Sequence, residues 1–199
     1  MEVDATNPTE MGHAEVHKGS GLAVAKDKKR WYVAECKPTR ERTICSMLND
    51  AGFESFVASR IEEKVYKSRN RYKKETAIIP GKVFVHTTED KLMEIMLSYS
   101  SVHRFMLNHA AKDRAYAFVS DVEMQMLQFM LGRAENPVHI TAASLKVNQK
   151  VKVLRGTLSG LEGLFYKEGR AAFVVIKLTM GISHYVFTEV PIEDIQVIE

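Results

Sequence analysis

The side chains best suited to acid–base or metal chemistry are scattered along this sequence. Two acidic pairs, Glu62-Glu63 and Glu89-Asp90, consist of adjacent residues, which on a strand or hairpin point to opposite faces and make poor acid–base partners. Neither a Gly-x-Ser-x-Gly motif nor a phosphate-binding loop accompanies them. The sequence therefore predicts a protein that is not an enzyme and uses no metal or cofactor. The histidines are spread over the whole chain: His13, His17, His86, His103, His109, His139 and His184.

The two cysteines, Cys36 and Cys45, are separated by eight residues. This spacing fits neither a Cys-x-x-Cys zinc or redox pair nor a dense disulfide framework. We interpret both as reduced thiols with a structural role.

Cationic side chains gather in "EEKVYKSRNRYKKE", where Tyr66 and Tyr72 stand among them. Lysine and arginine neutralise phosphates, and aromatic rings stack on bases. The pattern predicts a long basic hairpin, which either contacts nucleic acid or an acidic protein surface or, as is more common, is simply solvated. Its basic residues are Lys64, Lys67, Arg69, Arg71, Lys73 and Lys74.

The composition is that of an ordinary globular protein, with 45% hydrophobic and 27% charged residues in a chain of 199. The formal charge of +3 is only mildly basic, so any contact with nucleic acid should be a local patch. The N-terminus "MEVDATNPTE" lacks the features of a signal peptide, and no segment approaches the ~20 apolar residues of a membrane span. We expect a cytoplasmic protein without membrane contact.

The first elements to position these side chains should begin at Arg30. "RWYVAECK" is typical of a strand, and Pro38 then ends it and leaves Thr39 as the predicted N-cap of a helix that stops at Gly52. A strand "FESFVAS" and the basic hairpin follow. The apolar residues of the helix recur at helical spacing: Ile44, Met47, Leu48 and Ala51.

A rigid Pro80-Gly81 corner interrupts the apolar run "IIPGKVFVH" and leads into a strand. A helix capped by Thr88, a short strand "SVHRFML" and a further helix over 121–131 should follow. Ser120 and Glu123 form the capping box of that last helix. The helix is rich in methionine, so either it is buried between the sheet and another element or part of it meets a partner.

The last fifty residues contain five short strand-like runs separated by glycines and no helical period. Five short strands at this spacing predict a small closed or partly closed β-barrel. The predicted organisation is a flexible tail over 1–28, a first domain over 29–131, a linker over 132–148 and a second domain over 149–199.

This order of elements resembles the NusG family of transcription elongation factors over residues 30–199. The resemblance rests also on four sequence segments: "RWYVAECKP", "IIPGKVFV", "SSVHRFM" and "VKVLRGTLSGLEGLF". The first domain resembles the NusG N-terminal (NGN) domain, and the second resembles a KOW domain. The resemblance implies an α+β fold, with an antiparallel sheet flanked by helices followed by a small SH3-like β-barrel. The sequence after Val151 is rich in β-branched residues and interrupted by glycines, which favours the barrel over the helical hairpin that some relatives form in this domain.

The resemblance implies a monomer that binds the clamp helices of elongating RNA polymerase and reduces pausing or termination. Within the family, the sequence resembles the specialised RfaH and UpxY type more than the housekeeping factor. This suggests that the protein acts on the transcription of specific long operons such as capsule polysaccharide loci. Further implied partners are the non-template DNA strand and, through the KOW domain, a ribosomal protein or Rho. The alternative is a KOW-containing RNA- or ribosome-binding protein without polymerase contact.

The resemblance also implies three sets of site residues. Lys82 departs from the family pattern, because a tyrosine is usual at its position. Two of these sets also have a purely structural interpretation. The residues around the Pro80-Gly81 corner could be a core strand that starts at a turn, and the residues predicted to bind nucleic acid could be a solvated helix face. The implied sets are Trp31, Tyr32, Ile79, Pro80, Gly81, Lys82 and Phe84 for polymerase binding; Lys37, Arg40 and Arg42 for nucleic acid; and Gly156, Gly160 and Gly163 as the KOW signature.

Overall fold

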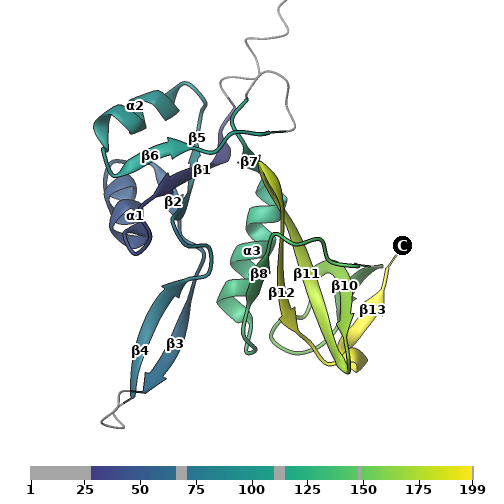
Figure 1. Cartoon of the computed structure of the whole chain (residues 1–199). Coiled ribbons are helices and arrows are strands. Elements are labelled where there is room, and N and C mark those ends of the chain that lie inside the picture. Colours follow the sequence, from purple (N-terminus) through teal and green to yellow (C-terminus); the bar gives the residue numbers. More distant parts are fainter. Residues whose placement is uncertain (1–27, 66–70, 110–114, 148, 199) are drawn as a thin grey trace, which may run out of the picture.

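The computed structural model describes residues 28–65, 71–109, 115–147 and 149–198 (Figure 1). Nearly all of the predicted tail and the tip of the basic hairpin, with Tyr66, Lys67 and Arg69, therefore lie outside the described residues. The fold is α+β, as predicted, with antiparallel strands throughout.

The N-terminal unit is built on an antiparallel sheet in the order β2-β5-β1-β6, with β7 also paired to β1. Strand β1 is central and buries residues on both faces, because "RWYVAEC" carries apolar side chains at odd and even positions alike. The bounds are β1 Arg30–Cys36, β2 Glu54–Phe56, β5 Lys82–Thr87, β6 Val102–Phe105 and β7 Phe118–Val119.

Helices α1 (Glu41–Asp50) and α2 (Lys91–Ser98) cover one face of this sheet. The two expected N-caps were wrong: the caps are Arg40 and Asp90, and neither side chain makes a capping hydrogen bond. Thr39 has φ 74°, whereas a capping residue needs an extended backbone, so Thr39 turns the chain before the helix instead of capping it.

Strands β3 (Ser59–Val65) and β4 (Arg71–Ala77) form a separate two-stranded antiparallel ladder. This ladder projects from the N-terminal unit (Figure 1). The predicted basic hairpin is confirmed for these described strands.

The C-terminal unit is a six-stranded antiparallel sheet in the order β13-β9-β10-β11-β12-β8. All five predicted strands are present, and β8, which pairs with β12, lies within the stretch predicted to be a linker. A short 3-10 helix, Ile192–Asp194, precedes the last strand. The bounds are β8 His139–Thr141, β9 Lys150–Val153, β10 Glu162–Glu168, β11 Ala171–Met180, β12 Ile182–Glu189 and β13 Ile195–Val197.

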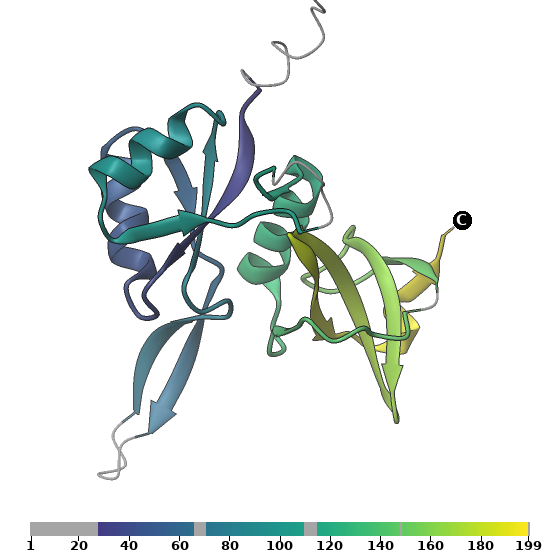
Figure 2. The same cartoon turned by 45° about the horizontal axis from the view of Figure 1, so that its top comes forward.

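Helix α3 (Asp121–Arg133) lies between the N-terminal sheet and the C-terminal sheet (Figures 1 and 2). Its Met124, Leu127 and Met130 are fully buried in one apolar core, which also contains residues of β1 and β5 on one side and of β11 on the other. This shared core favours the first of the two interpretations of the methionine-rich helix, burial between the sheet and another element.

The capping box of α3 is confirmed, and it also links the two units. One carboxylate oxygen of Glu123 accepts hydrogen bonds from the backbone N–H and the hydroxyl of Ser120. The other oxygen accepts hydrogen bonds from the backbone N–H and the hydroxyl of Thr179 on β11, at 3.2 and 3.0 Å. Glu123 therefore caps the helix and fixes it to the C-terminal sheet.

Candidate functional site

The Pro80-Gly81 corner joins three elements of the N-terminal unit. The Gly81 N–H donates to Oε1 of Glu41 at 2.7 Å, and the Gly81 carbonyl accepts from the N–H of Cys36 at 2.9 Å. Glu41 is buried although it carries a carboxylate, so its hydrogen bond replaces water lost on folding. The corner thus ties the start of β5 to the end of β1 and the first turn of α1.

The Cys36 thiol lies buried beside this corner. Burial and, to a smaller extent, the nearby Glu41 carboxylate raise the pKa of the Cys36 thiol to about 11 from its ordinary 9.0, against the opposing effect of Lys82. Since the neutral thiol is favoured in the folded state, its contribution to stability is complete below pH 9 and is lost as the pH rises toward 11.

We expect Cys36 in the folded protein to resist alkylation by iodoacetamide at pH 8, because both burial and the raised pKa keep thiolate scarce. Mass spectrometry of the labelled chain over a pH series measures this directly. Modification of Cys36 in the folded protein with a midpoint below pH 9 would contradict the expectation.

Three charged side chains stand side by side on the face of the sheet that also carries Trp31. Glu35 of β1 is the cross-strand neighbour of Lys82 on β5 and of Arg104 on β6. Its carboxylate binds Lys82 Nζ at 2.9 Å and Arg104 Nε through its other oxygen. We call Glu35, Lys82 and Arg104 the charged cluster.

The charged cluster has one well-exposed member. Burial opposes ionisation of Glu35, but the hydrogen bonds from Arg104 and Lys82 outweigh it and hold the pKa of Glu35 below its usual value. The Arg104 side chain is 73% exposed, against 19% for Glu35 and 23% for Lys82. Two cations and one anion leave a net positive charge, which the Arg104 guanidinium presents to solvent.

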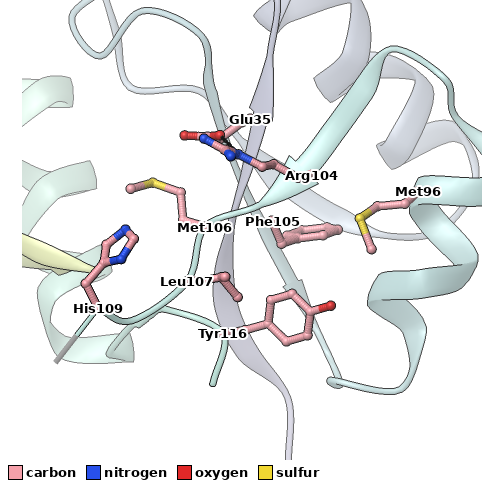
Figure 3. Close-up of a pocket in the computed structure, with 8 residues that line it drawn as sticks. All are labelled: Glu35, Met96, Arg104, Phe105, Met106, Leu107, His109 and Tyr116. Carbon is pink, nitrogen blue, oxygen red and sulfur yellow. Dashed lines mark hydrogen bonds and ion pairs between the residues drawn. The ribbon is translucent and has the colours of Figure 1, made fainter. Parts of the chain in front are cut away.

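A cavity of about 240 Å³ adjoins the charged cluster along the edge strand β6. Figure 3 shows the side chains that line it, with Phe105 between the charged pair of Glu35 and Arg104 and the ring of Tyr116. It is smaller than the about 300–1,000 Å³ of drug-sized ligand sites, so it suits a protein side chain better than a free cofactor. The lining residues are Glu35, Met96, Arg104, Phe105, Met106, Leu107, His109 and Tyr116.

The residues predicted for polymerase binding do not form one exposed surface. Trp31 and Phe84 are buried on the face toward α3, and Ile79 is buried beside them. Tyr32 is buried on the opposite face, under α1 and α2. Only Pro80 and the half-buried Lys82 are accessible, and Gly81 is enclosed at the corner.

The cluster partners of Lys82 were missed in the sequence. Glu35 and Arg104 are far from Lys82 along the chain, and only the register of three strands brings them together. The one available signal was the lysine itself, at a position where an aromatic residue was expected.

The three residues predicted for nucleic-acid binding, Lys37, Arg40 and Arg42, are all exposed near the start of α1. The Arg42 guanidinium lies 2.9 Å from the Glu75 carboxylate of β4, which ties α1 to the base of the hairpin. Lys37 and Arg40 form no ion pair with any residue that the structure describes. These two cations are therefore available to an anionic partner.

The three glycines of the predicted signature lie in and after the turn between β9 and β10. Gly156 and Gly160 have φ values of 78° and 91°, in the left-handed region. Gly163 is required for close packing, because a Cβ there would lie 2.7 Å from the carbonyl oxygen of Val175. All three positions have local structural reasons for glycine.

Within the described ranges, no group of three or more His, Cys, Asp or Glu side chains is arranged to hold a metal ion. Among those same residues, no helix is both long and apolar enough to cross a membrane.

A family model described as "Transcription termination factor nusG" matches residues 29–128, half of the chain. A comparison with curated proteins finds no match. Among solved structures, the one titled "Domain interaction in Thermotoga maritima NusG" is similar at 18% identity and a TM-score of 0.40, covering 86% of this chain and 98% of that chain. The structure titled "Crystal Structure of MjSpt4:Spt5 complex conformation B" is similar at 11% identity and a TM-score of 0.30, covering 85% of this chain and 97% of that chain.

Proposed function

Because the chain belongs to the NusG family, whose members are generally transcription elongation factors, we propose that it binds elongating RNA polymerase in the cytoplasm and reduces pausing or termination. The resemblance to specialised paralogues supports the proposal that it acts on specific long operons such as capsule polysaccharide loci. Family membership is the observation that carries the proposal, and the charged cluster supplies its accessible contact.

The proposed docking surface consists of the charged cluster and the cavity beside it. Arg104 offers an exposed guanidinium for a carboxylate of the partner, and the apolar lining of the cavity offers a place for a neighbouring apolar side chain. A helix of the polymerase clamp that carries both kinds of side chain would fit this surface. Lys82, which departs from the family pattern, then acts by holding Glu35 against Arg104.

The C-terminal unit is proposed to be a KOW domain, an SH3-like barrel over about 149–199, that recruits a further partner such as a ribosomal protein or Rho. Its strand order β13-β9-β10-β11-β12 and the glycines after β9 support this assignment. The N-terminal unit is correspondingly an NGN domain over 29–131. Lys37 and Arg40 are proposed to contact the exposed non-template DNA strand, because neither is engaged in an ion pair within the described part of the chain.

Arg104→Glu is expected to reduce retention of the full chain on a reconstituted elongation complex by at least about tenfold, because it reverses the exposed charge of the docking surface. Charge reversal here is a cleaner test than substitution of Phe84, whose burial in the core makes unfolding the expected result. Co-sedimentation with polymerase bound to a nucleic-acid scaffold measures retention.

The matched control is Lys167→Glu, the same charge change at an exposed position of β10 in the C-terminal unit. Equal retention of the wild type and a folded Arg104→Glu chain would remove the charged cluster from the docking surface. If the wild type itself is not retained by its natural polymerase, the alternative applies, that of an RNA- or ribosome-binding protein without polymerase contact.

A further inference from the structure

Four ring-bearing side chains form a continuous row across the C-terminal sheet. Tyr166 of β10 and Phe173 of β11 are direct cross-strand partners with ring centroids 5.7 Å apart. Phe187 of β12 lies 5.6 Å from Phe173 and 6.1 Å from Tyr166, and His139 of β8 lies 5.5 Å from Phe187. We call these four residues the aromatic row.

The aromatic row lies on the outer face of the sheet. Along β11, Val174, Ile176 and Leu178 enter the shared apolar core, so Phe173, which alternates with them, points to the other side. The rings of Tyr166, Phe173 and Phe187 are only half-buried, and His139 is exposed.

Two carboxylates flank one end of the aromatic row. Glu189 is the cross-strand partner of Phe173, and Glu168 follows Tyr166 by two residues on the same face of β10. Both are exposed, and neither is ion-paired to a residue that the structure describes. On the same face Lys177 lies four residues from Phe173, toward the opposite end of the row.

The arrangement suits a cation. Aromatic faces attract ammonium and guanidinium groups, and adjacent carboxylates add hydrogen bonds and charge attraction. The same carboxylates repel phosphate, which disfavours a nucleic-acid strand over this end of the row.

We propose that the aromatic row, with Glu168 and Glu189, binds an arginine or lysine side chain presented by a basic segment of a partner protein. This inference deepens the recruiting role proposed for the C-terminal unit and rests on it, since it names the chemistry of the recruited partner. Binding to the row can be measured without polymerase, so its failure is distinct from failure of the docking proposal.

The test uses the full chain and a hexa-arginine peptide, with binding measured by calorimetry and located by amide chemical shifts. Binding that shifts the amides of β10, β11 and β12 around the row is the expected result. Glu168→Gln with Glu189→Gln should weaken it about tenfold. Phe173→Leu, which keeps an apolar residue, should weaken it about threefold or more.

Lys177→Gln is the matched control, because it removes a charge of opposite sign from the same face and should leave binding unchanged or slightly tighter. Thermal unfolding confirms that each variant is folded. The proposal is overturned if the peptide does not bind, if it binds the folded double glutamine variant equally well, or if an oligouridine strand shifts the row while the peptide does not.

Discussion

Gly81→Ala is expected to lower the free energy of unfolding by about 3 kcal/mol. Gly81 has φ 72°, where any residue with a Cβ is strained by about 1 kcal/mol or more. The added Cβ would also lie 2.9 Å from the carbonyl oxygen of Cys36, a backbone atom that cannot move without shifting β1. The resulting displacement strains the hydrogen bond from Gly81 to buried Glu41.

Chemical denaturation followed by the fluorescence of Trp31, the one tryptophan of the chain, measures this effect. Gly52→Ala is the matched control: Gly52 also has a left-handed φ of 84°, but a Cβ there meets no atom within 4 Å. The control should lose only about 1 kcal/mol. Equal losses in the two variants would show that the corner is not a close-packed joint.

Gly181→Ala is expected to loosen the contact between the two units and to cost about 3 kcal/mol of stability. Gly181 forms the tip of the β11–β12 hairpin with φ 76°, and a Cβ there would lie 2.6 Å from the carbonyl oxygen of Leu107 in the N-terminal unit. Because the obstructing atom belongs to the backbone, the hairpin tip must move away from Leu107.

Amide hydrogen exchange should show faster exchange in this variant near Leu107 and at the hairpin tip, together with a lower midpoint of unfolding. Gly169→Ala is the matched control, since Gly169 lies in the β10–β11 turn with φ 59° and open space around it. If both variants lose about 1 kcal/mol and exchange alike, the close approach at Gly181 does not hold the units together.

The sequence predicted those features that depend on neighbours along the chain. The capping box of Ser120 and Glu123 and the five C-terminal strands follow from local spacing, and they are confirmed. The N-cap at Thr39 was wrong because the chain turns there through a left-handed conformation, which is uncommon for threonine and which the residue type therefore does not predict.

The candidate site depended instead on pairing between distant segments. Glu35, Lys82 and Arg104 become neighbours only through the register of three strands, so single positions could reveal no more than an unexpected lysine. The prediction of burial was limited in the same way. The sequence pattern identified Trp31 and Phe84 as large apolar residues on strands, but it could not distinguish an exposed sheet face from one covered by α3.

The shared core around α3 has a consequence for biosynthesis. Translation proceeds at about 5–20 residues per second, and the C-terminal strands that share this core extend to Glu189, more than fifty residues after the helix. For several seconds the nascent N-terminal unit can therefore pack α3 only against β1 and β5, and the side of the helix that meets β11 in the finished fold stays uncovered. During that interval the growing chain is a natural client for a ribosome-associated chaperone.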